Sequence, residues 1–311
     1  MTRPGPAAAP GPAPIAAPLP GQVDRPVLGL VLMLGFCVLA PASDATAKAL
    51  AMTIPVLQLV AIRFAVQASM LVPLVAAMGR DWRMSALGWR LTLLRTALQI
   101  AGIYLMTMAL IHLPLADAIA IAFVMPFILL LLGAVVLGET VGPRRLIACG
   151  VGFGGTLLVM QPNLITVGWP VIYPLAVAFV FAIFILVTRR LAREADPITM
   201  QAASGLIGLL ALVAAYVVLP RHGPMALVAP GDLWPLMLLM GALGTGGHLM
   251  MTWSLRHAPA ATLAPLQYVE IPVAALIGLM VFDDVPDPVA LLGIAVTVAA
   301  GLYVLWRESR A

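Results

Sequence analysis

The chain has 311 residues, of which 62% are hydrophobic and only 10% are charged, and its formal net charge at pH 7 is +4. Soluble globular domains carry about 25% charged residues, so this composition excludes an ordinary water-soluble fold. The basic residues are scattered through short connecting segments rather than clustered, which argues against nucleic acid as a partner.

The first 26 residues differ in composition from the rest of the chain. They hold eight prolines among alanines and glycines. They lack the basic start, apolar core and cleavage site of a signal peptide. We therefore predict that residues 1–26 form a disordered cytoplasmic N-terminal tail.

Apolar runs of membrane-spanning length recur from residue 27 onward, and a span needs about 20 mostly apolar residues. They cover residues 27–48, 55–78, 88–111, 114–137, 143–161, 170–190, 198–219, 233–255, 259–282 and 288–306. The sequence therefore predicts an all-α membrane protein with ten transmembrane helices. The lipid bilayer is its solvent.

The distribution of basic residues orients these spans, because cytoplasmic loops are enriched in lysine and arginine. The tail, the even-numbered loops and the C-terminus hold Arg3, Arg25, Arg80, Arg83, Arg90, Arg144, Arg145, Arg189, Arg190, Arg193, Arg256, Arg307 and Arg310. The other side has Arg221, and Lys48 at the edge of the first span. We therefore predict a multi-pass protein of the cell inner membrane with both termini cytoplasmic.

The chain contains an internal repeat. Residues 89–114 match residues 234–259 at an offset of 145, with twelve identities in twenty-six positions. The matches include pairs that apolar composition alone does not explain, namely Trp89 with Trp234, Gly102 with Gly247, His112 with His257 and Pro114 with Pro259. The repeat indicates two five-span halves, residues 27–161 and 170–307, joined by a periplasmic linker at 162–169. An odd number of spans inverts the second half relative to the first, and inverted repeats are an architecture of transporters.

Over about residues 27–307 the sequence resembles the EamA-type members of the drug/metabolite transporter superfamily. The resemblance is carried by the tandem arrangement of several short motifs. They are Asp44-Ala45-Thr46-Ala47-Lys48-Ala49-Leu50, Arg63, Leu113-Pro114-Leu115-Ala116-Asp117-Ala118, Leu137-Gly138-Glu139 and Gly150-Val151-Gly152-Phe153-Gly154-Gly155. It implies secondary transport of a small metabolite by alternating access, through a site between the halves. Amino-acid or drug export, and uptake of riboflavin or S-adenosylmethionine, are the activities that the resemblance suggests.

Glu270 is the strongest candidate for a solute or coupling site. An ionisable residue deep in a span costs about 2.5–3.5 kcal/mol on insertion scales, so its presence calls for a function. It lies near the middle of the ninth span beside Gln267 and Tyr268. Pro272 is expected to kink this span and to free the Tyr268 carbonyl, because proline lacks an N–H group. The carboxylate could bind a cationic group or a proton. The alternative is a structural pair with Arg63, Arg95 or His248.

Pro126 in the fourth span corresponds to Pro272 in the repeat. Paired breaks in equivalent helices indicate a cavity between repeats, whereas kinks packed by neighbouring helices are the alternative.

Asp44 and Lys48 share one face of the first span, because they are four residues apart. A local ion pair is one interpretation, and attraction or gating of solute is the other. Asp117, at the periplasmic mouth of the fourth span, has the same two interpretations.

Arg63 and Arg95 could hold an anionic group. Arg95 is close enough to Arg90 to reach the cytoplasmic interface instead, so Arg63 is the preferred candidate.

Several uncharged side chains complete the set of candidates. Gln99 and His248 fall in the middle of the third and eighth spans, although a lone histidine on an apolar helix is more often a core residue. Tyr104, Trp253 and Tyr268 could stack on a planar solute such as riboflavin, or could anchor the protein at the membrane interface.

Motifs of enzymes, nucleotide-driven pumps and metal sites are missing from the sequence. It predicts no catalytic residue, no metal and no cofactor, and energy from the gradient of the solute or of an ion such as the proton. The partners are therefore a small-molecule solute, protons in the coupled case, and the bilayer. Monomer and homodimer both stay open. The alternatives to transport are an intramembrane enzyme and a non-transporting integral membrane protein.

Overall fold

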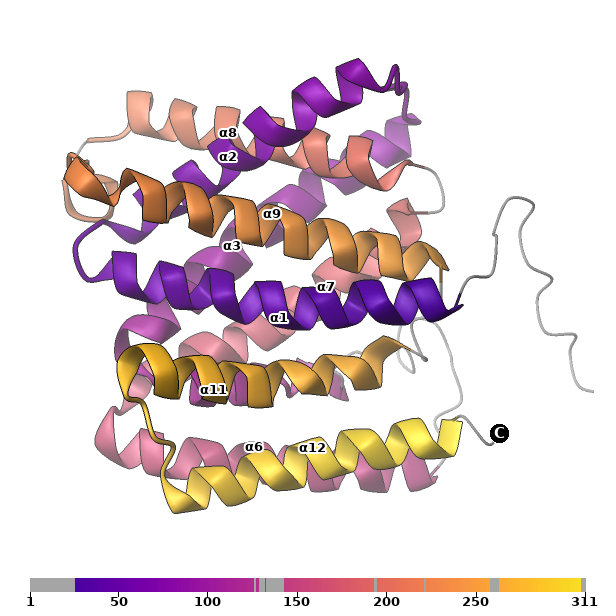
Figure 1. The fold of residues 1–311 in the computed structure, drawn as a ribbon, viewed down its shortest axis with the longest axis vertical. Coiled ribbons are helices and arrows are strands. Elements are labelled where there is room, and N and C mark those ends of the chain that lie inside the picture. The colour runs from indigo at the N-terminus through magenta and orange to yellow at the C-terminus, as the bar shows by residue number, and fades with distance from the viewer. Residues whose placement is uncertain are drawn as a thin grey trace, which may run out of the picture.

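A computed structural model describes residues 26–125, 127–128, 132, 143–192, 195–220, 222–257 and 263–308. The described residues fold into helices and their connections, with no β-strand among them. The helices lie side by side in one bundle (Figure 1). The α-helices are α1 (Pro26–Ala51), α2 (Val56–Ala77), α3 (Ala86–His112), α4 (Leu115–Ala122), α6 (Pro143–Thr166), α7 (Ile172–Leu191), α8 (Pro197–Val218), α9 (Trp234–His257), α11 (Glu270–Phe282) and α12 (Pro288–Glu308).

Four short 3₁₀ segments precede three of these helices. They are η1 (Trp169–Val171) before α7, η2 (Gly223–Met225) and η3 (Gly231–Leu233) before α9, and η4 (Ala264–Val269) before α11. Among them, η4 leads directly into Glu270, the first residue of α11.

The helices begin and end close to the predicted apolar runs. Six are long and apolar enough to cross a membrane, and they begin at Val27, Val56, Ala86, Trp169, Pro197 and Gly231. Gly150–Met160, Leu266–Phe282 and Pro288–Ala300 are shorter apolar helical stretches. These helices confirm the prediction of an all-α, multi-pass membrane protein. Helices suit this environment because each one satisfies its backbone hydrogen-bonding groups internally in lipid. The predicted tail, and much of the second half of the fourth span, lie outside the described residues.

Local sequence explains where several helices start. Proline is the first residue of α1, α6, α8 and α12, where its missing N–H group costs nothing. Asp196 caps α8 by accepting hydrogen bonds from the backbone N–H groups of Ile198 and Thr199, at 3.1 and 3.2 Å. Ser85 caps α3 in the same way through Gly88 N–H, at 2.9 Å.

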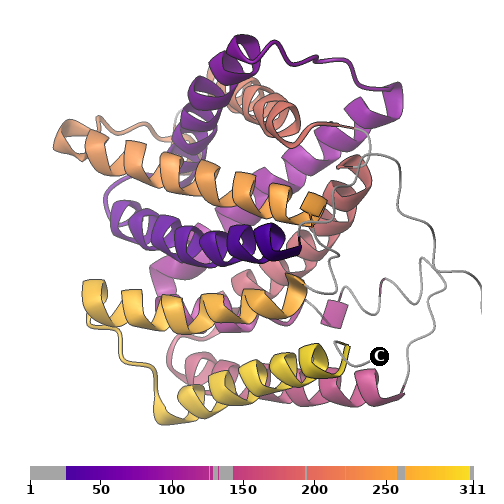
Figure 2. The same ribbon diagram turned by 45° about the vertical axis from the view of Figure 1, so that its right-hand side comes forward.

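The main helix pairs each join one helix from the first half of the chain to one from the second. In the centre of the bundle, α1 packs against α9 and α3 packs against α7. The pair α2–α8 lies at one end of the long axis and the pair α6–α12 at the other (Figures 1 and 2). The halves are therefore interleaved rather than separate domains.

The contact between α6 and α12 depends on glycine. A Cβ atom added at Gly155 would lie 2.5 Å from Thr297 Oγ1 and 2.9 Å from the Gly293 carbonyl oxygen. A Cβ atom added at Gly293 would lie 2.6 Å from the Gly155 carbonyl oxygen. The two backbones approach closely only because neither position carries a side chain, as is common between membrane helices.

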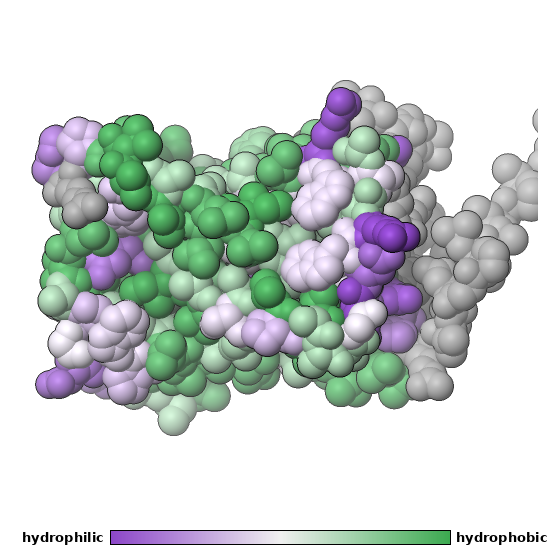
Figure 3. Space-filling model, turned by 90° about the horizontal axis from the view of Figure 1, so that it is seen from above, coloured by the Kyte–Doolittle hydropathy of each residue, from purple (hydrophilic) through white to green (hydrophobic). Residues whose placement is uncertain are grey.

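The outer surface is apolar between two polar ends. Figure 3 shows hydrophobic residues across the middle of one face and hydrophilic residues gathered at its two ends. Large exposed hydrophobic side chains include Leu210 and Val213 on α8 and Leu93 and Leu94 on α3. An apolar band of this kind is expected where lipid, rather than water, contacts the protein.

Candidate solute site

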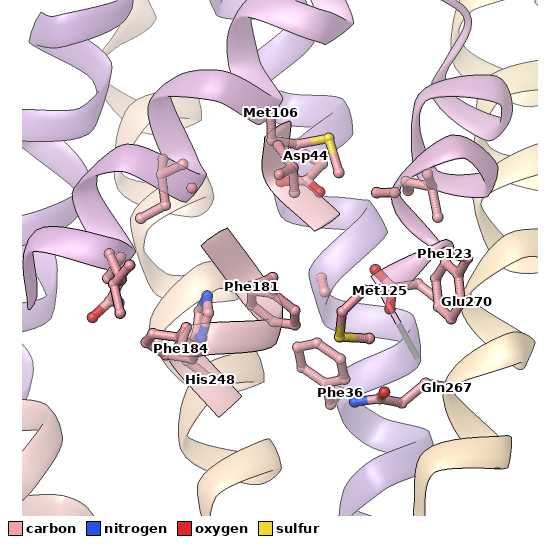
Figure 4. A pocket seen from close by; sticks show the side chains of 18 of the residues that line it. Phe36, Asp44, Met106, Phe123, Met125, Phe181, Phe184, His248, Gln267 and Glu270 are labelled. Atoms are coloured by element: carbon pink, nitrogen blue, oxygen red, sulfur yellow. The ribbon is translucent and has the colours of Figure 1, made fainter. Parts of the chain in front are cut away.

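A cavity lies between the central helices of the bundle. It spans about 820 Å³ of space free of protein atoms, part of which is open to the surroundings. Helices α1, α2, α3, α4, α7, α9 and α11 and the segment η4 contribute to its wall, so both halves of the chain line it. Figure 4 shows the side chains that surround it.

Six polar side chains line this cavity, and the sequence had marked each of them as a candidate. Each comes from a different element, so only the fold brings them together. They are Asp44, Arg63, Gln99, His248, Gln267 and Glu270.

Asp44 of α1 and Arg63 of α2 form an ion pair, with 3.8 Å between Oδ1 and Nη1. This distance is too long for a hydrogen bond, so the guanidinium keeps its donors for another acceptor. Gly244 of α9 makes room for the arginine, because a Cβ atom there would lie 2.6 Å from Arg63 Cζ.

Glu270 is the first residue of α11 and follows the 3₁₀ segment η4 directly. The backbone therefore changes its helical geometry in the middle of the ninth span, two residues before Pro272. A carboxylate is favoured at a helix N-terminus, where unpaired N–H groups carry partial positive charge. Among the residues that the structure describes, none forms an ion pair or a side-chain hydrogen bond with this carboxylate.

Aromatic rings form much of the remaining wall, and the sequence analysis missed them. Phe36, Phe123, Phe181 and Phe184 all line the cavity. Phe181 and Phe184 stack with 5.3 Å between ring centroids. The His248 ring meets Phe36 and Phe184 edge-on, at 6.3 and 5.9 Å. A phenylalanine inside an apolar span carries no sequence signal for a cavity, so these positions could not have been distinguished.

Glu270 and His248 lie on different sides of the cavity, with Phe36, Met125 and Phe181 between them in the view of Figure 4. His248 is 9% exposed, and its Nδ1 atom has no hydrogen-bond partner among the described residues. The cavity therefore presents a carboxylate on one side and an imidazole on the other, with aromatic rings beside them.

Arg95 does not reach the cytoplasmic interface, so that interpretation is wrong. Its side chain is fully buried between α3, α7 and α8. Its guanidinium donates to Thr188 Oγ1 at 3.1 Å, Ser204 Oγ at 2.7 Å and Gln201 Oε1 at 2.7 Å. Its position within the span was predictable from the sequence, whereas the direction of its side chain depends on these tertiary partners.

Asp44 and Lys48 do not pair with each other, although both are on α1. Lys48 instead forms an ion pair with Asp284 of the second half, and it donates to the Leu113 carbonyl oxygen at 3.3 Å. Asp44 forms its ion pair with Arg63 of α2. The local ion pair expected from the four-residue spacing is replaced by two tertiary contacts.

Four other candidates lie away from the cavity lining. Tyr104 packs against a cluster that includes Phe64 and Leu212, and Trp253 packs against a cluster that includes Leu71 and Ile198. Tyr268 is buried behind the wall, with its ring 5.2 Å from that of Phe123. Asp117 is buried in the first turn of α4. Pro126 lies outside the described residues.

Comparison with known proteins places this architecture in a family. A model of the EamA-like transporter family matches residues 27–161 and 168–306. The chain belongs to the EamA-like transporter family. A solved crystal structure of a protein shares the fold with a TM-score of 0.61, at 17% sequence identity, over 93% of this chain and 99% of the other.

Named relatives of this EamA-like chain transport small metabolites. A riboflavin transporter of Rhizobium johnstonii is 30% identical over 71% of this chain and 72% of its own length. A riboflavin transporter of Brucella anthropi is 27% identical over 70% and 77%. An S-adenosylmethionine uptake transporter of Rickettsia felis is 23% identical over 87% and 90%. The chain is a multi-pass transporter of a small metabolite.

Proposed function

We propose that the cavity binds a flat, nitrogen-containing ring compound of the riboflavin class, which the protein carries across the inner membrane. The observation that supports this most is the wall of four phenylalanines interrupted by the amides of Gln99 and Gln267. Aromatic rings favour a planar solute by stacking, and amides can both donate to and accept from the edge of a nitrogen heterocycle. The relatives named as riboflavin transporters support the same class.

S-adenosylmethionine is the second candidate, because one specific feature favours it. It also carries a nitrogen heterocycle, and it has cationic groups as well. Glu270 offers a carboxylate that no described residue pairs with, and Asp44, which forms an ion pair with Arg63, adds a second carboxylate to the lining. Desolvated carboxylates of this kind suit a cation.

The solute can be tested directly on purified protein. Riboflavin is expected to raise the apparent melting temperature in detergent and to be taken up saturably by proteoliposomes, with counterflow, because a ligand that binds only the folded state stabilises it. Flavin mononucleotide is the matched control, since its phosphate should be repelled by Glu270. Stabilisation and uptake with S-adenosylmethionine alone would select the second candidate. Activity with neither compound would contradict the proposed class.

We infer that transport proceeds by alternating access between two inverted five-helix repeats. Exchanging the halves maps α1 onto α7, α2 onto α8, α3 onto α9, α4 onto α11 and α6 onto α12. Under this exchange the contact of α1 with α9 becomes that of α7 with α3, and the contact of α1 with α11 becomes that of α7 with α4. Both members of each pair of contacts are present, which supports a two-fold relation with the cavity between the repeats.

Membrane topology provides a test of this inversion and of the orientation. Green fluorescent protein fused after Ala311 is expected to fluoresce, and alkaline phosphatase inserted in the connection between α8 and α9 is expected to be active, because that connection should be periplasmic. The matched control is phosphatase inserted between α2 and α3, which should be inactive. Chain ends on opposite faces of the membrane would rule out five spans per half.

A further inference from the structure

We propose that Arg95 is a positioning residue: from behind the cavity wall, it fixes the Phe184 ring and the Gln99 amide in the orientation that receives the solute. The inference deepens the proposed function and depends on the cavity being the solute site. It concerns a side chain that does not itself line the cavity.

The first observation is that the Arg95 side chain is buried and donates hydrogen bonds to four other side chains. Its side chain is 0% exposed. Nε donates to Thr188, Nη1 donates to Ser204 and to Gln99 Oε1 at 3.4 Å, and Nη2 donates to Gln201. All of these acceptors are uncharged. A buried cation without a carboxylate among its partners is costly, so a hydrophobic residue would be the better choice for stability alone.

The second observation is that Arg95 contacts two residues that line the cavity, Phe184 and Gln99. The Arg95 guanidinium carbon lies 4.7 Å from the centroid of the Phe184 ring. This ring lines the cavity and also touches His248 and Phe181. A cation over an aromatic ring is attracted by its π face, so the guanidinium holds the ring plane.

Gln99 is the other cavity residue that Arg95 orients. Its Oε1 accepts from Arg95, and its Nε2 donates to Gln67 Oε1 at 3.2 Å. Gln67 in turn donates to the Gln201 backbone carbonyl at 2.8 Å. The Gln99 amide is therefore held at both ends, which fixes which atom faces the solute. A preorganised donor and acceptor binds more tightly than a freely rotating amide.

The contacts of Arg95 also join the two halves of the chain. Arg95 lies on α3, whereas Thr188 lies on α7 and Gln201 and Ser204 lie on α8. The same guanidinium that positions the wall thus bridges the repeats next to the cavity, on the side of the bundle where α3 and α8 begin.

A double-mutant cycle in proteoliposomes, with the solute that the wild-type protein transports, tests this role. Arg95→Met is expected to raise KM about tenfold with a smaller change in maximal rate, and Arg95→Lys to restore only part of the affinity, because lysine lacks the planar fork. In the background of Phe184→Leu with Gln99→Ala, the same Arg95→Met change should raise KM less than about threefold, since the groups it positions are gone. Thr96→Val, on the next residue of α3, is the control for the helix itself. A tenfold effect of Arg95→Met in both backgrounds would overturn the inference.

A second measurement does not depend on the solute. With 4-fluorophenylalanine in place of phenylalanine, the fluorine resonance assigned to Phe184 should be single in the wild-type protein and broadened or split in Arg95→Met, but not in Thr96→Val. An unchanged resonance in Arg95→Met overturns the positioning role. A changed resonance together with no transport by the wild-type protein would instead count against the proposed function alone.

Discussion

Replacing Glu270 with glutamine is expected to reduce solute flux by about 100-fold while leaving the amount of protein in the membrane unchanged. The change removes the charge but keeps the shape, and charge-assisted hydrogen bonds contribute about 1.5–3 kcal/mol, equivalent to between 10- and 100-fold or slightly more in affinity. Glu270 also lacks a partner among the described side chains, so its substitution breaks no structural pair. Uptake of labelled solute by proteoliposomes measures the effect.

The control for this prediction makes the same chemical change outside the cavity. Asp232 is exposed in η3, and Asp232→Asn should transport at the wild-type rate. Counterflow without a pH gradient separates two roles of Glu270. Loss of counterflow in Glu270→Gln supports contact with the solute, as we propose. Retained counterflow together with lost uphill accumulation would assign the residue to proton coupling and refute a solute contact, and normal uptake would refute both.

Placing valine at Gly155 is expected to produce the largest loss of stability. The new side chain would force the backbones of α6 and α12 apart, because a Cβ atom there already lies 2.9 Å from backbone atoms of Gly293 and Thr297. Overpacking of this kind lowers the free energy of unfolding by about 1–3 kcal/mol, and here rigid backbone must move. The apparent melting temperature in detergent, and the yield of monodisperse protein, measure the change.

The neighbouring residue supplies a matched control for this substitution. A Cβ atom added at Gly154 meets no atom within 4 Å. Gly154→Val makes the same chemical change one position earlier on the same helix, so the effect of valine on helix propensity cancels in the comparison. Equal melting temperatures for the two variants would show that the close contact between α6 and α12 does not limit stability.

The positions of the helices were predictable because a membrane span has a strict length requirement and little tolerance for charge. For example, the run predicted at residues 55–78 is α2, Val56–Ala77, and the run at 198–219 is α8, Pro197–Val218. The ninth span differed in kind rather than position, because Ala264–Val269 within it forms the 3₁₀ segment η4. Two prolines accompany that change: Pro265 lies within η4, and Pro272 follows in α11.

Membrane depth also made part of the candidate site predictable. Glu270, Arg63 and His248 stood out because polar groups in the middle of a span are expensive, and all three line the cavity. Tyr104 and Trp253 were chosen for ring chemistry alone, and both pack into side clusters. The free-energy cost of burying a polar side chain in lipid was therefore a better guide to these cavity residues than the ability of a side chain to stack on a ligand.

The sequence by itself determined that this chain crosses the membrane many times, that its halves are related, and which side chains are too polar for their depth. Only the tertiary structure decided which way each side chain turns. Lys48 pairs with Asp284, 236 residues away, rather than with Asp44 four residues away. Arg95 faces a fully buried polar cluster, and four phenylalanines face a cavity. The physical reason is that helical periodicity fixes which residues share a face, whereas the rotation of each helix against its neighbours is set by packing across the whole bundle.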